Sequence, residues 1–162
     1  VELMKTTTDW WWGYWNNDKL REALQGAMNH SVAKYILWKY ENQLREQGKA
    51  GYILRYDQIE LPELEHIAPT TEPEIKPHGY DMYDEEFCNQ SLNCLGNYLL
   101  LSKSHNASIH NDPFWIKHKD FKYLEQQREV QKLVPDPSKG VWSREIIQSR
   151  KDKIINVIMR NC

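Results

Sequence analysis

The chain has 162 residues, and 40% of them are hydrophobic. A chain of this length can form one domain with a substantial apolar core but is too short for two. Charged residues make up 27%, and no run approaches the roughly 18 apolar residues of a membrane span, so we expect a soluble protein. The net charge is −2, but residues 1–102 hold 9 Lys and Arg against 16 Asp and Glu, while residues 103–162 hold 12 against 7. The basic C-terminal third suits a phosphate-facing surface, although a solvated helical face is the commoner cause of such an excess.

The first segment is rich in tryptophan, with Trp10, Trp11, Trp12 and Trp15 close together. Three interpretations compete: packing on this domain's own helices, which we favour, contact with a neighbouring domain, and stacking on bases. The chain begins at Val1 without an initiator Met or a secretion signal, so we expect a piece excised from a longer cytoplasmic protein.

Two helices are predicted next. The first runs from Asp18 to about His30, and the second runs from a Ser31 cap to about Gln47, where Gly48 ends it. An apolar face on the second helix is typical of core packing, and it consists of Val32, Ile36, Tyr40 and Leu44.

The middle of the chain predicts extended segments and loops. Residues 52–56 and 61–67 are extended, the second ending at Pro69, and residues 70–83 form a loop. A short helix near residues 84–90 precedes a buried strand over 97–101, and Ser102 is a natural cap for a helix directly behind it.

The C-terminal part predicts two further helices. One starts at Asp112-Pro113 and runs toward Arg128, and Pro135-Asp136-Pro137 then breaks the chain. The last helix opens at Ser143 and presents a core-facing stripe of Ile146, Ile147, Ile154, Ile155 and Ile158.

Four polar residues in the middle of the chain suit phosphodiester hydrolysis, which needs a base for water and a cation held near it. His66 has the chemistry of the base, and Glu65 beside it supplies the oxygen that magnesium or manganese prefers. The amide oxygen of Asn106 can add a ligand, and Asn97 would orient the His66 ring. Each residue alone is more often surface polarity or a turn residue, so the combination carries the hypothesis.

The ordered motifs resemble a known family. The string Leu64-Glu65-His66-Ile67-Ala68-Pro69, then Gly96-Asn97-Tyr98-Leu99-Leu100-Leu101 and Asn106, resembles the ββα-metal core of HNH nucleases. A closer similarity is to the C-terminal HNH-like domain of the GmrSD family of type IV, modification-dependent restriction endonucleases, through Asn111, Pro113, Phe114 and Lys117. Upstream residues 35–41, together with Trp142, Ile146 and Arg150, extend the resemblance to roughly residues 20–160. Tyr98 stands where the family usually has Leu, a change that we expect to be harmless on a strand.

Further candidate residues surround this motif. His110 lies four residues after Asn106, so it is either another metal ligand or a helix-surface histidine near a phosphate. Lys117 is the favoured phosphate contact because it matches the family pattern, with Lys103, Lys119 and Lys122 as further candidates. Cys88, Cys94 and Cys162 lack a Cys-x-x-Cys pair, which disfavours both a disulfide framework and a zinc site.

We therefore expect one domain over residues 1–162: an α+β, mainly helical fold enclosing a small ββα-metal core at about 61–118, with helical flanks at 18–48 and 143–160. The resemblance implies an endonuclease that cuts DNA with Mg or Mn, as the cutting domain of a bacterial, cytoplasmic anti-phage protein. It also implies an N-terminal NTP-hydrolysing domain or subunit as partner. The alternatives are a non-catalytic nucleic-acid-binding or assembly domain, which the four intact polar residues disfavour, and a nuclease that prefers RNA.

Overall fold

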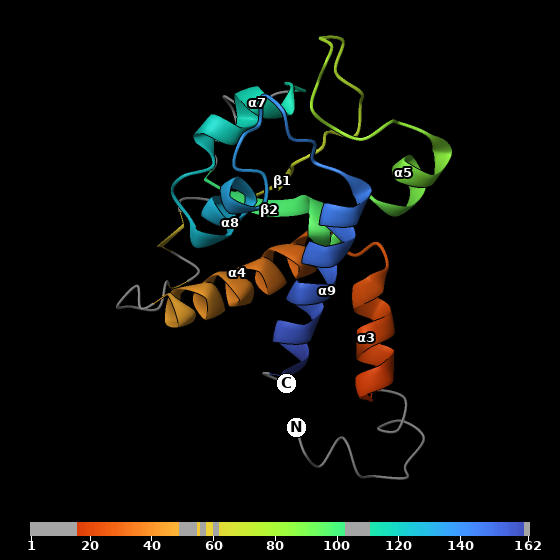
Figure 1. Ribbon diagram of the computed structural model, residues 1–162. Coiled ribbons are helices and arrows are strands. Elements are labelled where there is room, and N and C mark those ends of the chain that lie inside the picture. Colours follow the sequence, from red (N-terminus) through yellow and green to blue (C-terminus); the bar gives the residue numbers. More distant parts are fainter. Residues whose placement is uncertain (1–15, 49–54, 56–57, 60–61, 103–110, 161–162) are drawn as a thin grey trace.

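The computed structural model describes residues 16–48, 55, 58–59, 62–102 and 111–160. Its helices surround a two-stranded antiparallel sheet, so the fold class is α+β (Figure 1). None of the helices in these ranges is long and apolar enough to cross a membrane. The elements in chain order are α3 (Asn17–Gln25), α4 (His30–Gln47), β1 (Glu63–His66), α5 (Glu85–Gln90), the 3₁₀ turn η2 (Leu95–Asn97), β2 (Tyr98–Leu101), α7 (Phe114–Lys117), the 3₁₀ turn η3 (His118–Asp120), α8 (Glu125–Leu133) and α9 (Arg144–Arg160).

The β1–β2 ribbon lies between two apolar clusters. Side chains alternate along a strand, so Leu99 and Leu101 enter one cluster while Tyr98 and Leu100 enter the other. The first cluster contains Phe114 and Trp142, and the second is formed largely by residues of α4 and α9. Because both faces of β2 are covered, its sequence is an uninterrupted apolar run rather than an alternating one.

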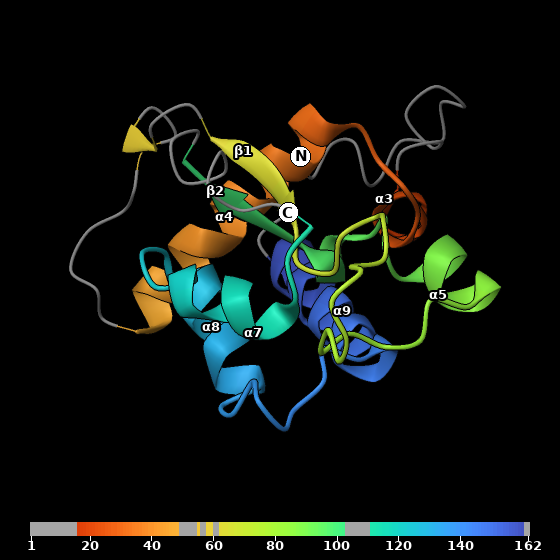
Figure 2. The same ribbon diagram turned by 90° about the horizontal axis from the view of Figure 1, so that it is seen from above.

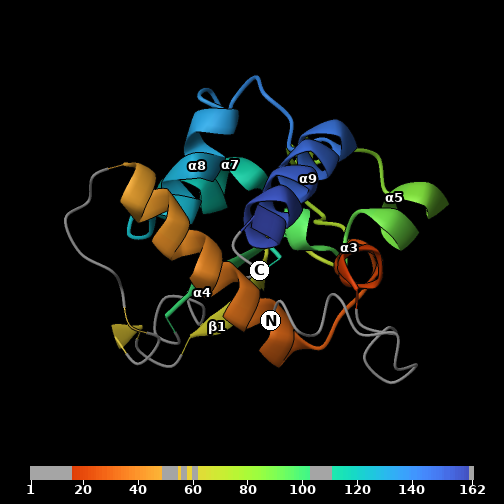
Figure 3. The same ribbon diagram turned by 90° about the horizontal axis from the view of Figure 1, so that it is seen from below.

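Helices α4 and α9 pack against each other on one side of the ribbon, and α3 packs on α9 (Figures 1 and 3). Helix α8 packs on α4 and on β2, and Figure 2 shows α7 next to α8. The predicted isoleucine stripe of α9 is confirmed, with Ile147, Ile154 and Ile155 buried and Ile146 and Ile158 partly buried.

The two N-terminal helices differ from the sequence prediction at their ends. Helix α3 stops at Gln25, before Gly26, rather than near residue 30. Asn29, not Ser31, caps α4, because its side-chain oxygen accepts the backbone N–H of Ser31 at 2.8 Å. The buried face of α4 includes Ile36 and Tyr40 as expected, but Val32 is 50% exposed, and Ala33 and Leu37 are buried instead.

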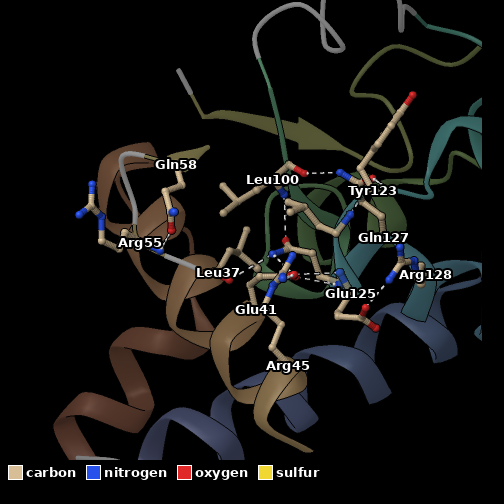
Figure 4. A network of polar contacts seen from close by, with 12 residues as sticks. Leu37, Glu41, Arg45, Arg55, Gln58, Leu100, Tyr123, Glu125, Gln127 and Arg128 are labelled. Carbon is tan, nitrogen blue, oxygen red and sulfur yellow. Dashed lines mark hydrogen bonds and ion pairs between the residues drawn. The ribbon is translucent and has the colours of Figure 1, made fainter. Parts of the chain in front are cut away.

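The single helix predicted over residues 112–128 is wrong. Residues 114–120 form α7 and η3, residues 121–124 leave the helical path, and a separate helix α8 begins at Glu125. The start of α8 is stabilised from another helix: the carboxylate of Glu41 on α4 accepts the backbone N–H groups of Glu125 and Gln126, each at 2.9 Å (Figure 4). The N-cap residue itself is Leu124, which has no capping side chain, so the usual sequence signal for a helix start is missing there.

Helix α8 also covers the free edge of β2. Gln126 accepts the N–H of Leu100 through Oε1 at 2.9 Å, and Gln127 donates to the Leu100 carbonyl at 2.9 Å (Figure 4). These two side chains replace the neighbouring strand that the edge lacks. The predicted tryptophan packing, the strand at 52–56 and the helix behind Ser102 lie outside the described residues.

Candidate active site

Glu65 and His66 lie at the end of β1, where Glu65 pairs with Leu99 and His66 pairs with Tyr98 across the ribbon. Adjacent strand residues point to opposite faces, and the contacts follow this rule. The Glu65 side chain meets Lys117 from α7, whereas the His66 ring meets Asn93 and Tyr98. The chain then leaves the ribbon through Ile67 and Ala68, which are fully buried.

The carboxylate of Glu65 forms a buried ion pair with Lys117. Lys117 Nζ lies 2.5 Å from Glu65 Oε1 and also donates to the backbone carbonyl of His66 at 2.9 Å. Burial raises the pKa of Glu65 and lowers the pKa of Lys117, and each charge offsets part of the other's shift. Lys117 therefore fixes both backbone and side chain at the end of β1.

This position corrects the prediction that Lys117 contacts phosphate. Its side chain is 2% exposed and already holds an acidic partner, so a DNA phosphate has no access to the ammonium group in this structure. Lys119 and Lys122 are exposed, and their ammonium groups lie over the rings of Trp115 and Tyr123. A phosphate contact by either of these two lysines stays a prediction.

The His66 ring has partners that the sequence analysis missed. Its Nε2 lies 3.0 Å from Asn93 Oδ1, and its ring meets the Tyr98 ring edge-on, with centroids 4.8 Å apart. Burial lowers the pKa of His66, Lys117 and His30 lower it further, and the hydrogen bond to Asn93 partly opposes them. A lowered pKa keeps the imidazole neutral near neutral pH, the state in which it can accept a proton.

Asn97 does not orient this ring directly, which corrects that prediction. Its Oδ1 accepts from the backbone N–H of Ala68 and from Trp142 Nε1, and its Nδ2 donates to the carbonyls of Ala68 and Leu92. Two acceptor sites and two donors are all that an amide side chain has, so none remains for His66. Asn97 instead joins the segment after His66 to the segment before Asn93.

The glycine before Asn97 makes this arrangement possible. A Cβ on Gly96 would lie 2.0 Å from the carbonyl oxygen of Ile147, so only glycine lets this turn lie directly on α9. Arg150 of α9 then donates to the carbonyls of Gly96 and Tyr98, at 2.8 and 2.7 Å. The Gly-Asn motif is thus fixed by packing and backbone hydrogen bonds.

The proposed metal ligands are only partly described. Asn106 and His110, like Lys103, lie outside the described residues, and within those residues no group of three His, Cys, Asp or Glu side chains could hold a metal ion. Of the proposed metal ligands, Glu65 is described, and it offers a carboxylate at the end of β1. Magnesium commonly takes one or two protein carboxylates and keeps several waters, so a carboxylate and an amide oxygen fit such an ion.

Cys88 and Cys94 are free thiols, and Cys94 Sγ donates to the Ser91 carbonyl within the core.

One comparison with known proteins identifies the family. The model of the C-terminal domain of GmrSD restriction endonucleases matches residues 10–157, a range that contains every residue of the site. No curated protein and no solved structure matches the chain. Since the match covers nearly the whole chain, the protein belongs to the family of GmrSD restriction endonuclease C-terminal domains.

Proposed function

We propose that this domain is an HNH-type, metal-dependent endonuclease that hydrolyses phosphodiester bonds in DNA. The observation that supports it most is the placement of His66 at the end of β1, where its Nε2 lies 3.0 Å from Asn93 Oδ1 and its chain neighbour is the carboxylate of Glu65. Burial lowers the pKa of His66, which agrees with a neutral imidazole. A neutral, oriented imidazole and a carboxylate at consecutive positions of one strand end supply a proton acceptor and an oxygen ligand, the two groups that activating water with a cation requires.

In this proposal each site residue has a separate role. His66 takes the proton from the attacking water, and Glu65 and Asn106 hold a divalent cation, with His110 as a candidate further ligand. The cation, when bound, neutralises charge on the phosphate and the leaving oxygen. Lys117 balances the charge of Glu65 and keeps the end of β1 in place. Asn97 acts through the backbone, by holding Ala68.

The wider setting is also part of the proposal. Membership of a restriction-endonuclease family supports a cutting domain of a bacterial, cytoplasmic anti-phage protein. It also supports an N-terminal NTP-hydrolysing domain or subunit as its partner. Exposed Lys119 and Lys122, with Lys103, are the proposed phosphate contacts along the DNA.

The test is cleavage of supercoiled plasmid DNA in magnesium or manganese, against a chelator control. His66→Ala should lose on the order of 10²–10⁴-fold in rate while still binding DNA, because only the proton acceptor is removed. Asn106→Ala removes a ligand, so its activity should fall and its metal dependence should move to higher concentration.

Raising manganese then separates the two defects. It should restore part of the Asn106→Ala loss and almost none of the His66→Ala loss, because only the first is a defect of metal occupancy. Full activity in His66→Ala, or equal rescue of both variants, would rule out His66 as the general base. Lys132→Ala, at an exposed position on α8, is a suitable surface control.

A further inference from the structure

The His66 ring is held by two residues to which neither the motif nor the family match assigns a role. Asn93 lies in the turn between α5 and η2, and its Oδ1 is 3.0 Å from His66 Nε2. Tyr98, opposite His66 in the β1–β2 pairing, packs its ring edge-on against the imidazole at an interplanar angle of 83°. The Tyr98 hydroxyl also reaches Asn93 Oδ1, at 3.5 Å. The three side chains therefore form a closed triangle.

The backbone around this triangle is fixed by buried contacts. Asn97, which is fully buried, donates from Nδ2 to the carbonyl of Leu92, the residue before Asn93. The same Nδ2 donates to the carbonyl of Ala68, two residues after His66. One amide thus sets the spacing between the backbone segments that carry the exposed Asn93 and the half-buried His66, whose side chains meet at 3.0 Å.

The chemistry of the triangle decides which ring nitrogen is basic. An amide oxygen only accepts hydrogen bonds, so a neutral His66 that bonds to Asn93 Oδ1 must carry its proton on Nε2. The Tyr98 hydroxyl lies 3.5 Å from the same oxygen and can donate to it as well. The lone pair then lies on Nδ1, to which no described residue forms a hydrogen bond.

We infer that Asn93 and Tyr98 are positioning residues that hold the His66 ring with Nε2–H on Asn93, so that Nδ1 is the atom that takes the proton from water. The inference rests on the proposed nuclease function, but its structural part does not need activity. Leucine at position 98 could not fill this role, because an aliphatic side chain has neither the hydroxyl nor the flat ring.

Nitrogen-15 NMR of the His66 ring, in the metal-free 162-residue chain at a pH where the ring is neutral, tests the structural part directly. The ring shifts should report protonation at Nε2 and an unprotonated Nδ1. An Asn93 amide turned over would donate to Nε2 instead and leave the proton on Nδ1, and that spectrum would overturn the inference. The spectrum is decisive even for a preparation that cuts no DNA.

Variants at Asn93 test the functional part. Asn93→Leu removes the acceptor, so the Nε2–H signal should lose protection from solvent exchange and kcat should fall about 10- to 100-fold with KM little changed, the scale at which partners orienting metal-bound histidines act. Asn93→Asp keeps an acceptor oxygen and should recover most of kcat. Asn89→Leu, at an exposed asparagine of the preceding helix, is the matched control and should change neither signal nor rate.

Variants at Tyr98 separate its ring from its hydroxyl. Tyr98→Phe keeps the edge-on packing and loses only the long 3.5 Å contact, so its kcat should fall less than that of Tyr98→Leu. Unchanged ring signals and full kcat in Asn93→Leu would refute the inference while leaving the nuclease proposal intact. Full activity in His66→Ala would refute the nuclease proposal itself, so the two failures are distinguishable.

Discussion

Lys117 and Glu65 place opposite charges in nearly dry surroundings, with 2% and 13% of their side chains exposed. Such a pair contributes little net stability compared with apolar residues, yet removing one member leaves an uncompensated buried charge. The pair therefore constrains the site more than it stabilises the fold. A bound cation at Glu65 would also have to share this carboxylate with the lysine.

The first prediction concerns this pair. Lys117→Met should lower the free energy of unfolding by about 3 kcal/mol, because Glu65 loses its partner while the volume is nearly kept. Urea titration measures the loss. The double variant Glu65→Gln/Lys117→Met should recover much of it, because no charge is then left unpaired. Lys119→Met, at an exposed position, should stay within about 0.5 kcal/mol of the wild type. An equal loss in the single and double variants would contradict this account.

At the residue scale, the prediction from sequence placed Glu65 and His66 near the end of an extended segment, because Pro69 bounds that segment. It missed Asn93, since an asparagine in a turn is ordinary and its contact with His66 joins residues 27 positions apart. It misassigned Lys117 for a related reason. Burial of a lysine beside a glutamate 52 residues away has no local signature. Tyr98 could have been found only from the register of the two predicted strands, which places it opposite His66.

At the scale of elements, Glu129 of α8 joins three helices. Its carboxylate accepts from Tyr40 of α4 at 2.6 Å and from Arg150 and Lys153 of α9 at 3.1 and 2.5 Å. Arg150 in turn holds the carbonyls of η2. The turn that carries Asn97 is therefore connected through Arg150 to the packing of α4, α8 and α9.

The second prediction follows from the protonation of Glu129. Burial alone would raise its pKa, but Arg150 and Lys153 outweigh burial, so the net pKa lies below the ordinary value of 4.5. A depressed carboxyl pKa contributes stability that is complete above the ordinary pKa and is lost as the pH falls through the folded-state pKa. Glu129→Gln should therefore cost about 3 kcal/mol near neutral pH, because Arg150 stays buried without a counter-charge.

The pH dependence provides the check on Glu129. In urea unfolding, the gap between wild type and Glu129→Gln should be widest near neutral pH and should narrow as the pH falls below 4.5. Glu125→Gln on the same helix is the control. Its partner Arg128 is half exposed, so this surface pair is worth at most about 1 kcal/mol. A gap that is constant from acid to neutral pH would mean that the Glu129 charge is not the cause.

The elements themselves were predictable where local signals set their ends, as Gly48 does for α4 and the isoleucine stripe does for α9. Helix α8 was not, because its first N–H groups are satisfied by Glu41, 84 residues away. The paired strands were found as extended segments. Their register and the covering of Leu100 by Gln126 and Gln127 are tertiary facts, which propensities do not encode.

At the scale of the whole molecule, the ribbon lies between two apolar clusters, and Glu65 and His66 lie at the ribbon's end. Glu65 pairs with Leu99 of the cluster that contains Phe114 and Trp142, and the His66 ring contacts Tyr98 of the other cluster. A cation bound at this end would contact a part of the chain that both cores support. Its binding should therefore be coupled to global unfolding.

The third prediction uses that coupling. A ligand that binds only the folded state stabilises it by RT ln(1 + [L]/Kd), about 2.7 kcal/mol when manganese is present at about 100 times its Kd. For a chain of this size, each kcal/mol moves the Tm by roughly 2–4 °C, so manganese should raise the wild-type Tm by roughly 5–10 °C, measured by calorimetry with a chelator control.

Glu65→Gln should lose most of this manganese-induced shift because a neutral amide replaces the carboxylate, whereas His66→Ala should keep it because the base is not a ligand. Lys117→Met should show a larger shift than the wild type, since no lysine then competes for Glu65. A manganese shift of the same size in Glu65→Gln would place the cation elsewhere on the molecule, and no shift at millimolar manganese in any variant would remove the metal from the proposed site.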